Sequence, residues 1–405
     1  MADMSASERL ALITENLQEV LNQPLIEDIL AEGGHPKIYW GIELARLANP
    51  IADTSVRIPF MITDDNNTES NTSIYAVPAV KIAQFLAAGC DITVLIADIH
   101  AYLDNLKAPL ELVEYRAKYY QFIITAMLQA VGVATEKLKF VLGSSYQTSS
   151  KYVMDVYKLS SLVTEHEAKR AGSEIVKQSN AGPLSGLLYP ILQILDEEHL
   201  GCDAQFGGVD QRKLFAASID WSSKVGHRRR AHLMNPMAPG LTGGKMSSSE
   251  EDSKIDLLEA PESVRKKIRK AQTAPREVEH NGILAFVQYV LLPVSKLKNG
   301  SPEFRVSRER DGLEPLVYTN IEKMHEDYKN DVLTPQLLKP CVADALIEIM
   351  APMRAAFEAS PEWQEVAIKA YPPVQKQKKE KKQKDKGTRH PGAMKEETPN
   401  PAENQ

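Results

Sequence analysis

A glycine-rich loop with one lysine and three hydroxyl groups is the part of the sequence best suited to phosphate chemistry. It runs Gly240-Leu-Thr-Gly-Gly-Lys-Met-Ser-Ser-Ser249. It is not a Walker A loop, because three residues rather than four separate Gly240 from Gly244, and Met246 rather than Ser or Thr follows Lys245. Such a loop could still close over a polyphosphate, with Lys245 neutralising charge that develops in the transition state. The competing interpretation, more common for an isolated Lys-Met-Ser, is a solvated surface loop that caps a helix.

A second candidate group lies on an expected helix over residues 183–200. Tyr189, Gln193 and Asp196 stand at positions i, i+4 and i+7, which places them on one face of that helix. A carboxylate and an amide on this face could hold an ammonium group and a phenolic hydroxyl in a mostly apolar pocket. The alternative is an ordinary amphipathic helix whose polar residues face water.

Short apolar runs alternate with longer periodic segments up to about Lys254, which predicts a parallel sheet covered by helices on both faces. Beyond Lys254 the strand signals fade and a helical region follows. The expected strands are 37–40, 92–97, 139–142, 202–206 and 231–234, and the expected helices are 108–131, 183–200, one from Asp210, 261–272 and 333–357.

The N-terminal segment Met1–Leu21 predicts an amphipathic helix rather than a targeting signal. Ser5-x-x-Glu8 is a capping box, and apolar residues follow it at helical spacing: Leu10, Ile13, Leu17 and Leu21. The segment carries acidic residues and lacks the apolar core of a signal peptide. No uninterrupted apolar stretch in the chain approaches the ~20 residues that span a bilayer.

Charge is divided unevenly along the chain of 405 residues, whose formal net charge is −6. Residues 375–405 hold nine Lys or Arg against five Asp or Glu, so this end carries +4 and the remainder −10. A basic tail on an acidic body suggests a polyanionic partner. The three cysteines are far apart, which excludes a disulfide scaffold and a cysteine-rich zinc site and fits a reducing compartment.

Several stretches together resemble the class I aminoacyl-tRNA synthetases, in the eukaryotic cytosolic tyrosyl form. The loop Lys245-Met-Ser-Ser-Ser249 is similar to the second signature of that class. The other matching stretches are Lys37-Ile-Tyr-Trp-Gly41, Ala97-Asp-Ile-His-Ala-Tyr-Leu-Asp-Asn105, Gly186-Leu-Leu-Tyr-Pro190, Asp203-Ala-Gln-Phe-Gly-Gly-Val-Asp-Gln-Arg-Lys213 and His232-Leu-Met-Asn-Pro236. The resemblance covers nearly the whole chain except one segment, and the short tail is similar to the fungal type.

The resemblance implies tyrosine–tRNA ligase activity, with tyrosine, ATP and tRNA(Tyr) as substrates. Mg²⁺ would arrive with ATP, and no resident metal or tightly bound cofactor is expected. The implied tyrosine pocket is Tyr39, Tyr189, Gln193, Asp196 and Gln211, and the implied ATP and adenylate contacts are Gly41, Gly208, Asp210, Met237 and Lys245. Lys245, Ser247 and Ser249 would act on the pyrophosphate. Asp210 as a helix N-cap and Met237 as a core residue are the structural alternatives.

The family also implies a domain order and a cytoplasmic homodimer with no membrane association. We expect a Rossmann-like catalytic domain over residues 1–256, an α-helical anticodon-binding domain over 257–373 and a disordered Lys-rich tail over 374–405. Residues 105–165 would form the connective insertion through which two copies pair. Two basic runs, His227-Arg-Arg-Arg230 and Arg265-Lys-Lys-Ile-Arg-Lys270, could meet tRNA phosphates, although charge runs on helices are usually solvated faces.

One segment departs from the family. Residues 43–74 replace the first class I signature, Thr72 stands where its catalytic histidine belongs, and no glycine occurs between Gly41 and Gly89. Losing one such transition-state donor typically costs ~10²–10³ in rate. The segment, expected to be a disordered insert, could be retained intron or a splice error, the mark of an inactive tRNA-binding paralogue, or a true active variant. A tryptophanyl synthetase shares the fold and loop, and Tyr39 and Asp196 disfavour it.

Overall fold

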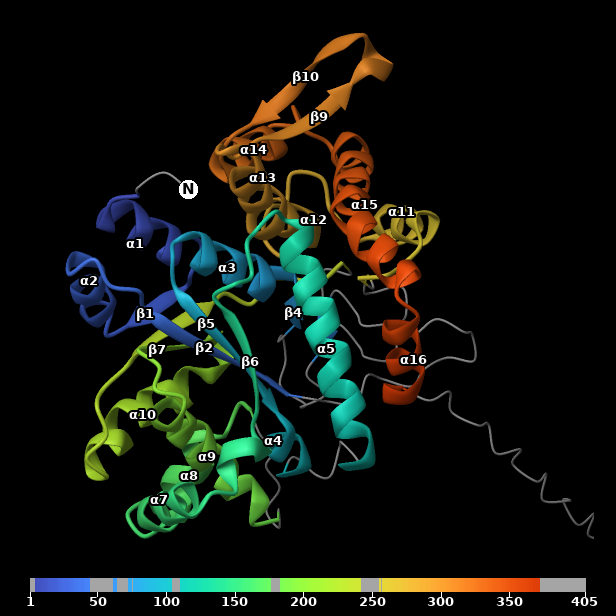
Figure 1. Ribbon diagram of the computed structural model, residues 1–405. Helices are drawn as coiled ribbons and strands as arrows, with labels where there is room; N and C mark the ends of the chain where they lie inside the picture. The colour runs from blue at the N-terminus through green and yellow to red at the C-terminus, as the bar shows by residue number, and fades with distance from the viewer. Residues whose placement is uncertain are drawn as a thin grey trace, which may run out of the picture. The chain divides into compact units, whose positions relative to one another are not determined.

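A computed structural model describes residues 4–43, 61–63, 72–74, 76–103, 110–175, 183–241, 255 and 257–371 (Figure 1). Its centre is a six-stranded sheet in the order β1-β8-β7-β2-β5-β6. The strands are β1 (Glu19–Leu21), β2 (Lys37–Glu43), β5 (Asp91–Ala97), β6 (Leu138–Leu142), β7 (Ala204–Gly208) and β8 (Ala231–Asn235). All neighbours run parallel except β1, which pairs antiparallel with β8 at the edge. The predicted α/β fold is confirmed.

Alternation along the strands sends side chains to two buried faces. On β2, Ile38, Trp40 and Ile42 join the larger core, whereas Tyr39 belongs to a cluster on the opposite face. The first face is covered by α1 (Ala6–Thr14), α2 (Pro24–Ala31), α3 (Ala76–Ala87) and α5 (Leu110–Ala130). The second is covered by α7 (Ser150–Ser160), α8 (Glu165–Ala171), α9 (Ser185–His199) and α10 (Arg212–Lys224). Figure 1 shows these two groups of helices on either side of the sheet.

Short elements connect the strands at the sheet's carboxyl edge. They are α4 (Asp98–Leu103) after β5, α6 (Ser144–Gln147) after β6 and a 3₁₀ turn, Val209–Gln211, after β7. Within the atypical segment 43–74, β3 (Met61–Thr63) and β4 (Thr72–Ile74) form an antiparallel pair. The other residues between Glu43 and Thr72 lie outside the described part of the chain, as does the tail from residue 372.

The C-terminal region is mainly helical. It contains α11 (Pro261–Lys270), α12 (Gly282–Phe286), a π-helical turn (Val287–Leu291), α13 (Leu292–Asn299), α14 (Ile321–Lys329), α15 (Pro335–Ala359) and α16 (Pro361–Ala370). It also contains a hairpin that the sequence reasoning did not predict, β9 (Phe304–Arg308) and β10 (Leu313–Tyr318), joined by the 3₁₀ turn Glu309–Asp311. Residues 1–373 form one compact unit. The boundary expected near residue 256 falls inside it and stays a prediction.

The N-terminal helix is shorter than expected. Its capping box forms as predicted, with the Ser5 hydroxyl accepting from the Glu8 backbone N–H. The helix ends at Thr14, however, because Asn16 adopts a left-handed conformation with φ 60°. The extension of the helix to Leu21 was therefore wrong: Leu17 lies beyond the helix, and Leu21 lies in β1 opposite His232.

Candidate active site

The sheet reverses its strand order between β2 and β7. Its parallel strands run β6-β5-β2-β7-β8, so the chain moves outward from β2 first on one side and then on the other. In open α/β sheets, ligands bind at the carboxyl ends of the strands that flank such a reversal. Tyr39 lies opposite Gln205 and Trp40 opposite Phe206, which brings the ends of β2 and β7 together. The candidate residues of both strands therefore meet at this edge.

Asp196 on α9 is the buried anion of the site, with no solvent exposure. Its Oδ1 accepts hydrogen bonds from the Tyr146 hydroxyl at 2.7 Å and from the Gln147 amide at 2.8 Å. The Tyr152 hydroxyl lies 2.8 Å from the same oxygen and 2.9 Å from the Leu192 carbonyl, and its single proton serves one of the two at a time. Donors from α6 and α7 thus fix one oxygen of a carboxylate carried by α9.

The other oxygen of Asp196 has no hydrogen-bond partner among the described residues. Nε2 of His100 lies 3.6 Å from it, and both nitrogens of this buried imidazole are likewise without a hydrogen bond there. Burial raises the pKa of Asp196 against the opposing effects of His100 and the three donors, and burial lowers the pKa of His100. An unpaired buried carboxylate oxygen is costly, so this one is suited to a hydroxyl or ammonium donor from a ligand.

The structure brings the five expected tyrosine-pocket residues together. The Tyr39 hydroxyl donates to the Gln193 carbonyl at 3.2 Å, and the Gln193 amide donates to Oε1 of Gln211 at 2.8 Å. The Tyr189 ring meets the His100 ring edge-on, 4.8 Å between centroids, and His100 in turn faces Asp196. Burial first and the charge of Asp196 second raise the pKa of Tyr39, which keeps its hydroxyl protonated as a donor.

Glycines at the strand ends keep the backbone accessible. Among the described atoms, a Cβ at Gly41 would meet only the Tyr39 ring, at 3.8 Å. A Cβ at Gly208 would collide with Oδ1 of Asp210, so this glycine lets the Asp210 carboxylate fold back over the end of β7. Met237, half-buried, follows the end of β8 by two residues. Gly41, Gly208, Asp210 and Met237 therefore all lie at the carboxyl edge where an adenylate is expected.

The predicted pyrophosphate residues Lys245, Ser247 and Ser249 lie outside the described residues. Among the residues that are described, no three or more His, Cys, Asp or Glu side chains gather as a metal site would require. In that same part of the chain, no helix is long and apolar enough to cross a membrane.

Each basic run proposed for tRNA contact contains one arginine or lysine that is buried and paired. Arg230 is 2% exposed and its guanidinium lies 2.6 Å from Glu198. Lys267 of α11 is 6% exposed and bonded to Glu259 at 2.7 Å. Neither side chain is placed to contact an RNA phosphate, because its charge is already neutralised inside the protein. Phosphate contacts by the other residues of the two runs stay a prediction.

The sequence reasoning missed the residues that support Asp196: His100, Tyr146, Gln147 and Tyr152. A signal for two of them was present. The expected strand 139–142 is followed by Gly143-Ser-Ser-Tyr-Gln147, a run of polar side chains at the carboxyl end of a parallel strand. Such ends meet at one edge of the sheet, so a buried carboxylate nearby could have been matched to these donors.

Comparisons with known proteins show the family of the chain. The family model for class I tRNA synthetases (W and Y) matches residues 73–351. The cytoplasmic tyrosine–tRNA ligase of Saccharomyces cerevisiae is 48% identical over 97% of this chain and 96% of its own length. That of Danio rerio is 48% identical over 93% of this chain and 65% of its own length. A crystal structure of tyrosyl-tRNA synthetase complexed with L-tyrosine, from Archaeoglobus fulgidus, superposes with a TM-score of 0.73 at 31% identity, covering 87% of this chain and 99% of that one. The chain therefore belongs to the class I tRNA synthetases, and within them to the tyrosine–tRNA ligases.

Proposed function

We propose that this chain activates tyrosine with ATP and transfers it to tRNA(Tyr) in the cytoplasm. A carboxylate oxygen of tyrosine attacks the α-phosphorus of ATP, which forms tyrosyl-adenylate and releases pyrophosphate. A hydroxyl of the terminal tRNA ribose then attacks the tyrosyl carbonyl and releases AMP. The observation that carries the proposal is the buried Oδ2 of Asp196, which has no hydrogen-bond partner among the described residues and belongs to a carboxylate whose charge acts on the Tyr39 hydroxyl.

Asp196 and Tyr39 select tyrosine by its phenolic hydroxyl. This hydroxyl donates to Oδ2 of Asp196 and so satisfies the buried oxygen. Phenylalanine fills the same space without a donor and leaves the oxygen unpaired, which costs ~1–3 kcal/mol or more for a buried charged group. Tyr189, Gln193 and Gln211 then hold the ammonium end, where neighbouring amide and hydroxyl groups lie along α9 and the turn after β7.

Catalysis in this site is positioning and charge stabilisation, because no covalent bond to the protein forms. Gly41 and Gly208 let the phosphates approach the strand ends, Asp210 holds ribose hydroxyls and Met237 lines the adenine site. Lys245, Ser247 and Ser249 stabilise the departing pyrophosphate, and Mg²⁺ enters as part of the ATP substrate.

The active assembly is a homodimer. In support, α7 lies within the predicted connective insertion and exposes large apolar side chains: Met154 is 51% exposed and Tyr157 63%, with Leu162 just beyond the helix at 47%. Apolar groups clustered on a surface helix favour burial against another surface. A second copy of the chain presents the same patch, as a two-fold interface requires.

The C-terminal region from residue 257 binds the anticodon, and the Lys-rich tail assists. Four basic residues of α11 are exposed: Arg265, Lys266, Arg269 and Lys270. They supply phosphate contacts, while Lys267 and its Glu259 partner hold the helix in place. A tail that neutralises even ~4 phosphates makes binding fall steeply with salt, with a slope of roughly −3 to −4 on logarithmic axes.

Charging of tRNA tests the function. The full chain is incubated with ATP, Mg²⁺, tRNA(Tyr) and labelled tyrosine or tryptophan. Tyrosine is expected on tRNA, and tryptophan is not. Binding of tRNA without charging would show an inactive paralogue, and preference for tryptophan would show the wrong substrate. Transcript reads across codons 42–75 complete the test, because an isoform with the usual histidine signature would identify residues 43–74 as a splice product.

A further inference from the structure

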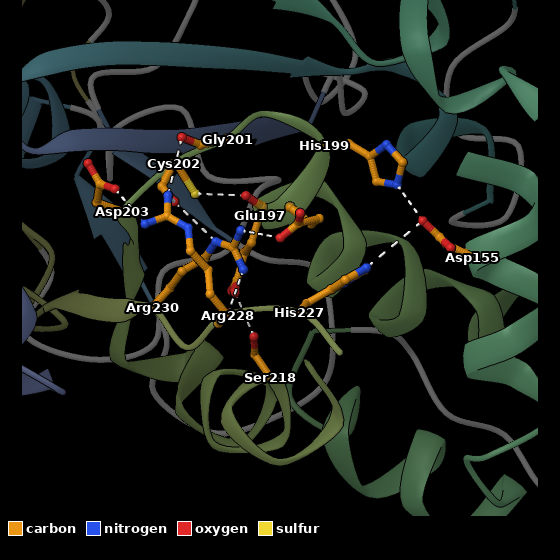
Figure 2. Close-up of polar contacts among 11 residues, drawn as sticks. Asp155, Glu197, His199, Gly201, Cys202, Asp203, Ser218, His227, Arg228 and Arg230 are labelled. Atoms are coloured by element: carbon orange, nitrogen blue, oxygen red, sulfur yellow. Dashed lines mark hydrogen bonds and ion pairs between the residues drawn. The ribbon is translucent and has the colours of Figure 1, made fainter. Parts of the chain in front are cut away.

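The basic run His227–Arg230 has a different role from the RNA contact that its composition suggests. Each of the three guanidinium nitrogens of Arg230 donates a hydrogen bond inside the protein. Nε donates to the Cys202 carbonyl at 3.1 Å, Nη1 to the Arg228 carbonyl at 2.7 Å and Nη2 to Oε2 of Glu198 at 2.6 Å. Figure 2 shows Arg230 among the residues at the C-terminal end of α9. Its side chain is 1% exposed, so it ties parts of the protein together.

Glu198 stands two residues after Asp196, and the residue between them is anchored as well. Glu197, 1% exposed, shares a hydrogen bond of 2.9 Å with Nε2 of His232 on β8. It accepts another, of 2.7 Å, from the Ser218 hydroxyl on α10 (Figure 2). Successive helix residues point about 100° apart. Because Glu197 and Glu198 are held by separate partners, α9 can neither rotate about its axis nor slide along it. The direction of the Asp196 side chain is thereby fixed as well.

The same cluster reaches the strand that carries Tyr39. Arg228 donates to the Cys202 carbonyl at 2.6 Å and pairs with Oδ1 of Asp203 at 2.9 Å. The other oxygen of Asp203 accepts from the backbone N–H of Lys37, at the start of β2, at 2.8 Å. Arg228 and Arg230 thus connect the end of α9 to the starts of β7 and β2. The two halves of the pocket, Asp196 on α9 and Tyr39 on β2, are joined through this cluster.

We propose that Arg230, through Glu198, is a positioning residue for the tyrosine pocket that sets Asp196 against Tyr39 and does not bind RNA. The proposal rests on the function proposed above. Misplacement of a binding group by a fraction of an ångström is enough to weaken selection for a substrate hydroxyl. Loss of the Arg230–Glu198 contact therefore weakens recognition of tyrosine and leaves recognition of tRNA intact.

The test compares Arg230→Met, Glu198→Gln and the matched control Arg229→Ala, whose parent arginine is exposed. Arg230→Met keeps an unbranched apolar stem in place of the arginine stem and removes the guanidinium, and Glu198→Gln keeps the acceptor while removing the charge. ATP–pyrophosphate exchange is measured against tyrosine, phenylalanine and ATP concentration, and charging against tRNA concentration. Thermal melting reports whether each variant is folded.

For Arg230→Met we expect a rise of about tenfold in KM for tyrosine and reduced preference for tyrosine over phenylalanine, with KM for ATP and tRNA changed less than about twofold. Glu198→Gln should show the same pattern more weakly, and Arg229→Ala should leave KM for tyrosine unchanged. General loss of stability would lower the active fraction without moving these ratios.

Two results would overturn the proposal: an unchanged tyrosine KM and selectivity in folded Arg230→Met, or a selective rise in KM for tRNA. If Arg230→Met does not fold, Glu198→Gln decides, because Arg230 keeps its two backbone bonds in that variant. Absence of tyrosine-dependent exchange in the unmodified chain would instead refute the proposed function, so the two failures are distinct.

Discussion

Oδ2 of Asp196 faces Nε2 of His100 across 3.6 Å, and neither atom has a hydrogen bond among the described residues. Every other strong contact of the Asp196 carboxylate goes to Oδ1. The protein therefore fixes one oxygen with its own donors and keeps the other for the substrate. A buried carboxylate oxygen without a donor lowers the stability of the ligand-free protein. A tyrosine hydroxyl that donates to this oxygen removes the cost.

Asp196→Asn should raise the free energy of unfolding and weaken selection for tyrosine over phenylalanine. Asparagine keeps an acceptor for the donors at Oδ1 and offers an N–H toward His100. Because the folded-state pKa of Asp196 is raised above the usual 3.8, the unfolded chain loses this proton at lower pH than the folded one. The stability contribution of the carboxylate therefore falls as pH rises through that window.

Urea unfolding of the ligand-free protein checks this. The variant should gain ~1 kcal/mol or more over the unmodified chain at pH 7.5, with a smaller gain near pH 4.5, while preference for tyrosine over phenylalanine falls at least about tenfold. A variant that is less stable at both pH values, or that still selects tyrosine, would contradict the account.

Lys81 should give the stability of the protein a rising pH dependence. Its buried ammonium donates to the carbonyls of Leu12 and Glu15 at the end of α1, at 3.0 and 2.7 Å. Burial lowers the pKa of Lys81 from 10.5 to about 7. Between these values the unfolded chain binds a proton that the folded chain does not, so the free energy of unfolding rises with pH by at most about 1.4 kcal/mol per unit.

Lys81→Met removes the titrating ammonium. The free energy of unfolding of this variant should therefore rise less than that of the unmodified chain between pH 7 and 10. Lys298→Met is the control, since Lys298 is an exposed lysine. If the free energy of unfolding rose equally with pH in the unmodified chain and in Lys81→Met, Lys81 would titrate at its ordinary pKa.

Tyr157→Glu should convert the proposed dimer to a monomer. The substitution places a charge at the centre of the exposed apolar patch on α7, where pairing would bury it without a partner. Light scattering coupled to size-exclusion chromatography measures the mass. Ile368→Glu on α16, with a comparably exposed parent side chain at 58%, should leave the mass unchanged. A dimer that survives Tyr157→Glu would place the interface elsewhere.

Lys245→Ala should slow adenylate formation more than it weakens tyrosine binding. The lysine is expected to act on charge that grows in the transition state, where removal of one such group costs ~10²–10³ in rate. Single-turnover formation of adenylate and equilibrium binding of tyrosine measure the two effects. Equal losses in rate and affinity would refute the transition-state role.

Local pattern was enough to predict the scaffold of the site. The five parallel strands were located to within three residues at either end, because short apolar runs bounded by turns mark strands buried on both faces. Helical spacing also placed Tyr189, Gln193 and Asp196 on one face of α9. These features depend on neighbours along the chain, which a single sequence contains.

The missed features depend on contacts between distant residues. The edge strand β1 has only three residues and exists through its pairing with β8, more than 200 positions away. His100, Tyr146 and Tyr152 reach Asp196 only when α4, α6 and α7 converge on α9. Burial of Arg230 likewise follows from Glu198 and Cys202, so its charge run could not be distinguished in sequence from a solvated one.

Selective activation of tyrosine by this chain is expected to depend on Asp196 and Tyr39. ATP–pyrophosphate exchange by the unmodified full chain, with tyrosine, phenylalanine or tryptophan as the only amino acid, tests it most directly. We expect exchange with tyrosine, and exchange rates at least about tenfold lower with phenylalanine and with tryptophan at equal concentration. Exchange that is absent with tyrosine, or equal with phenylalanine, would contradict it.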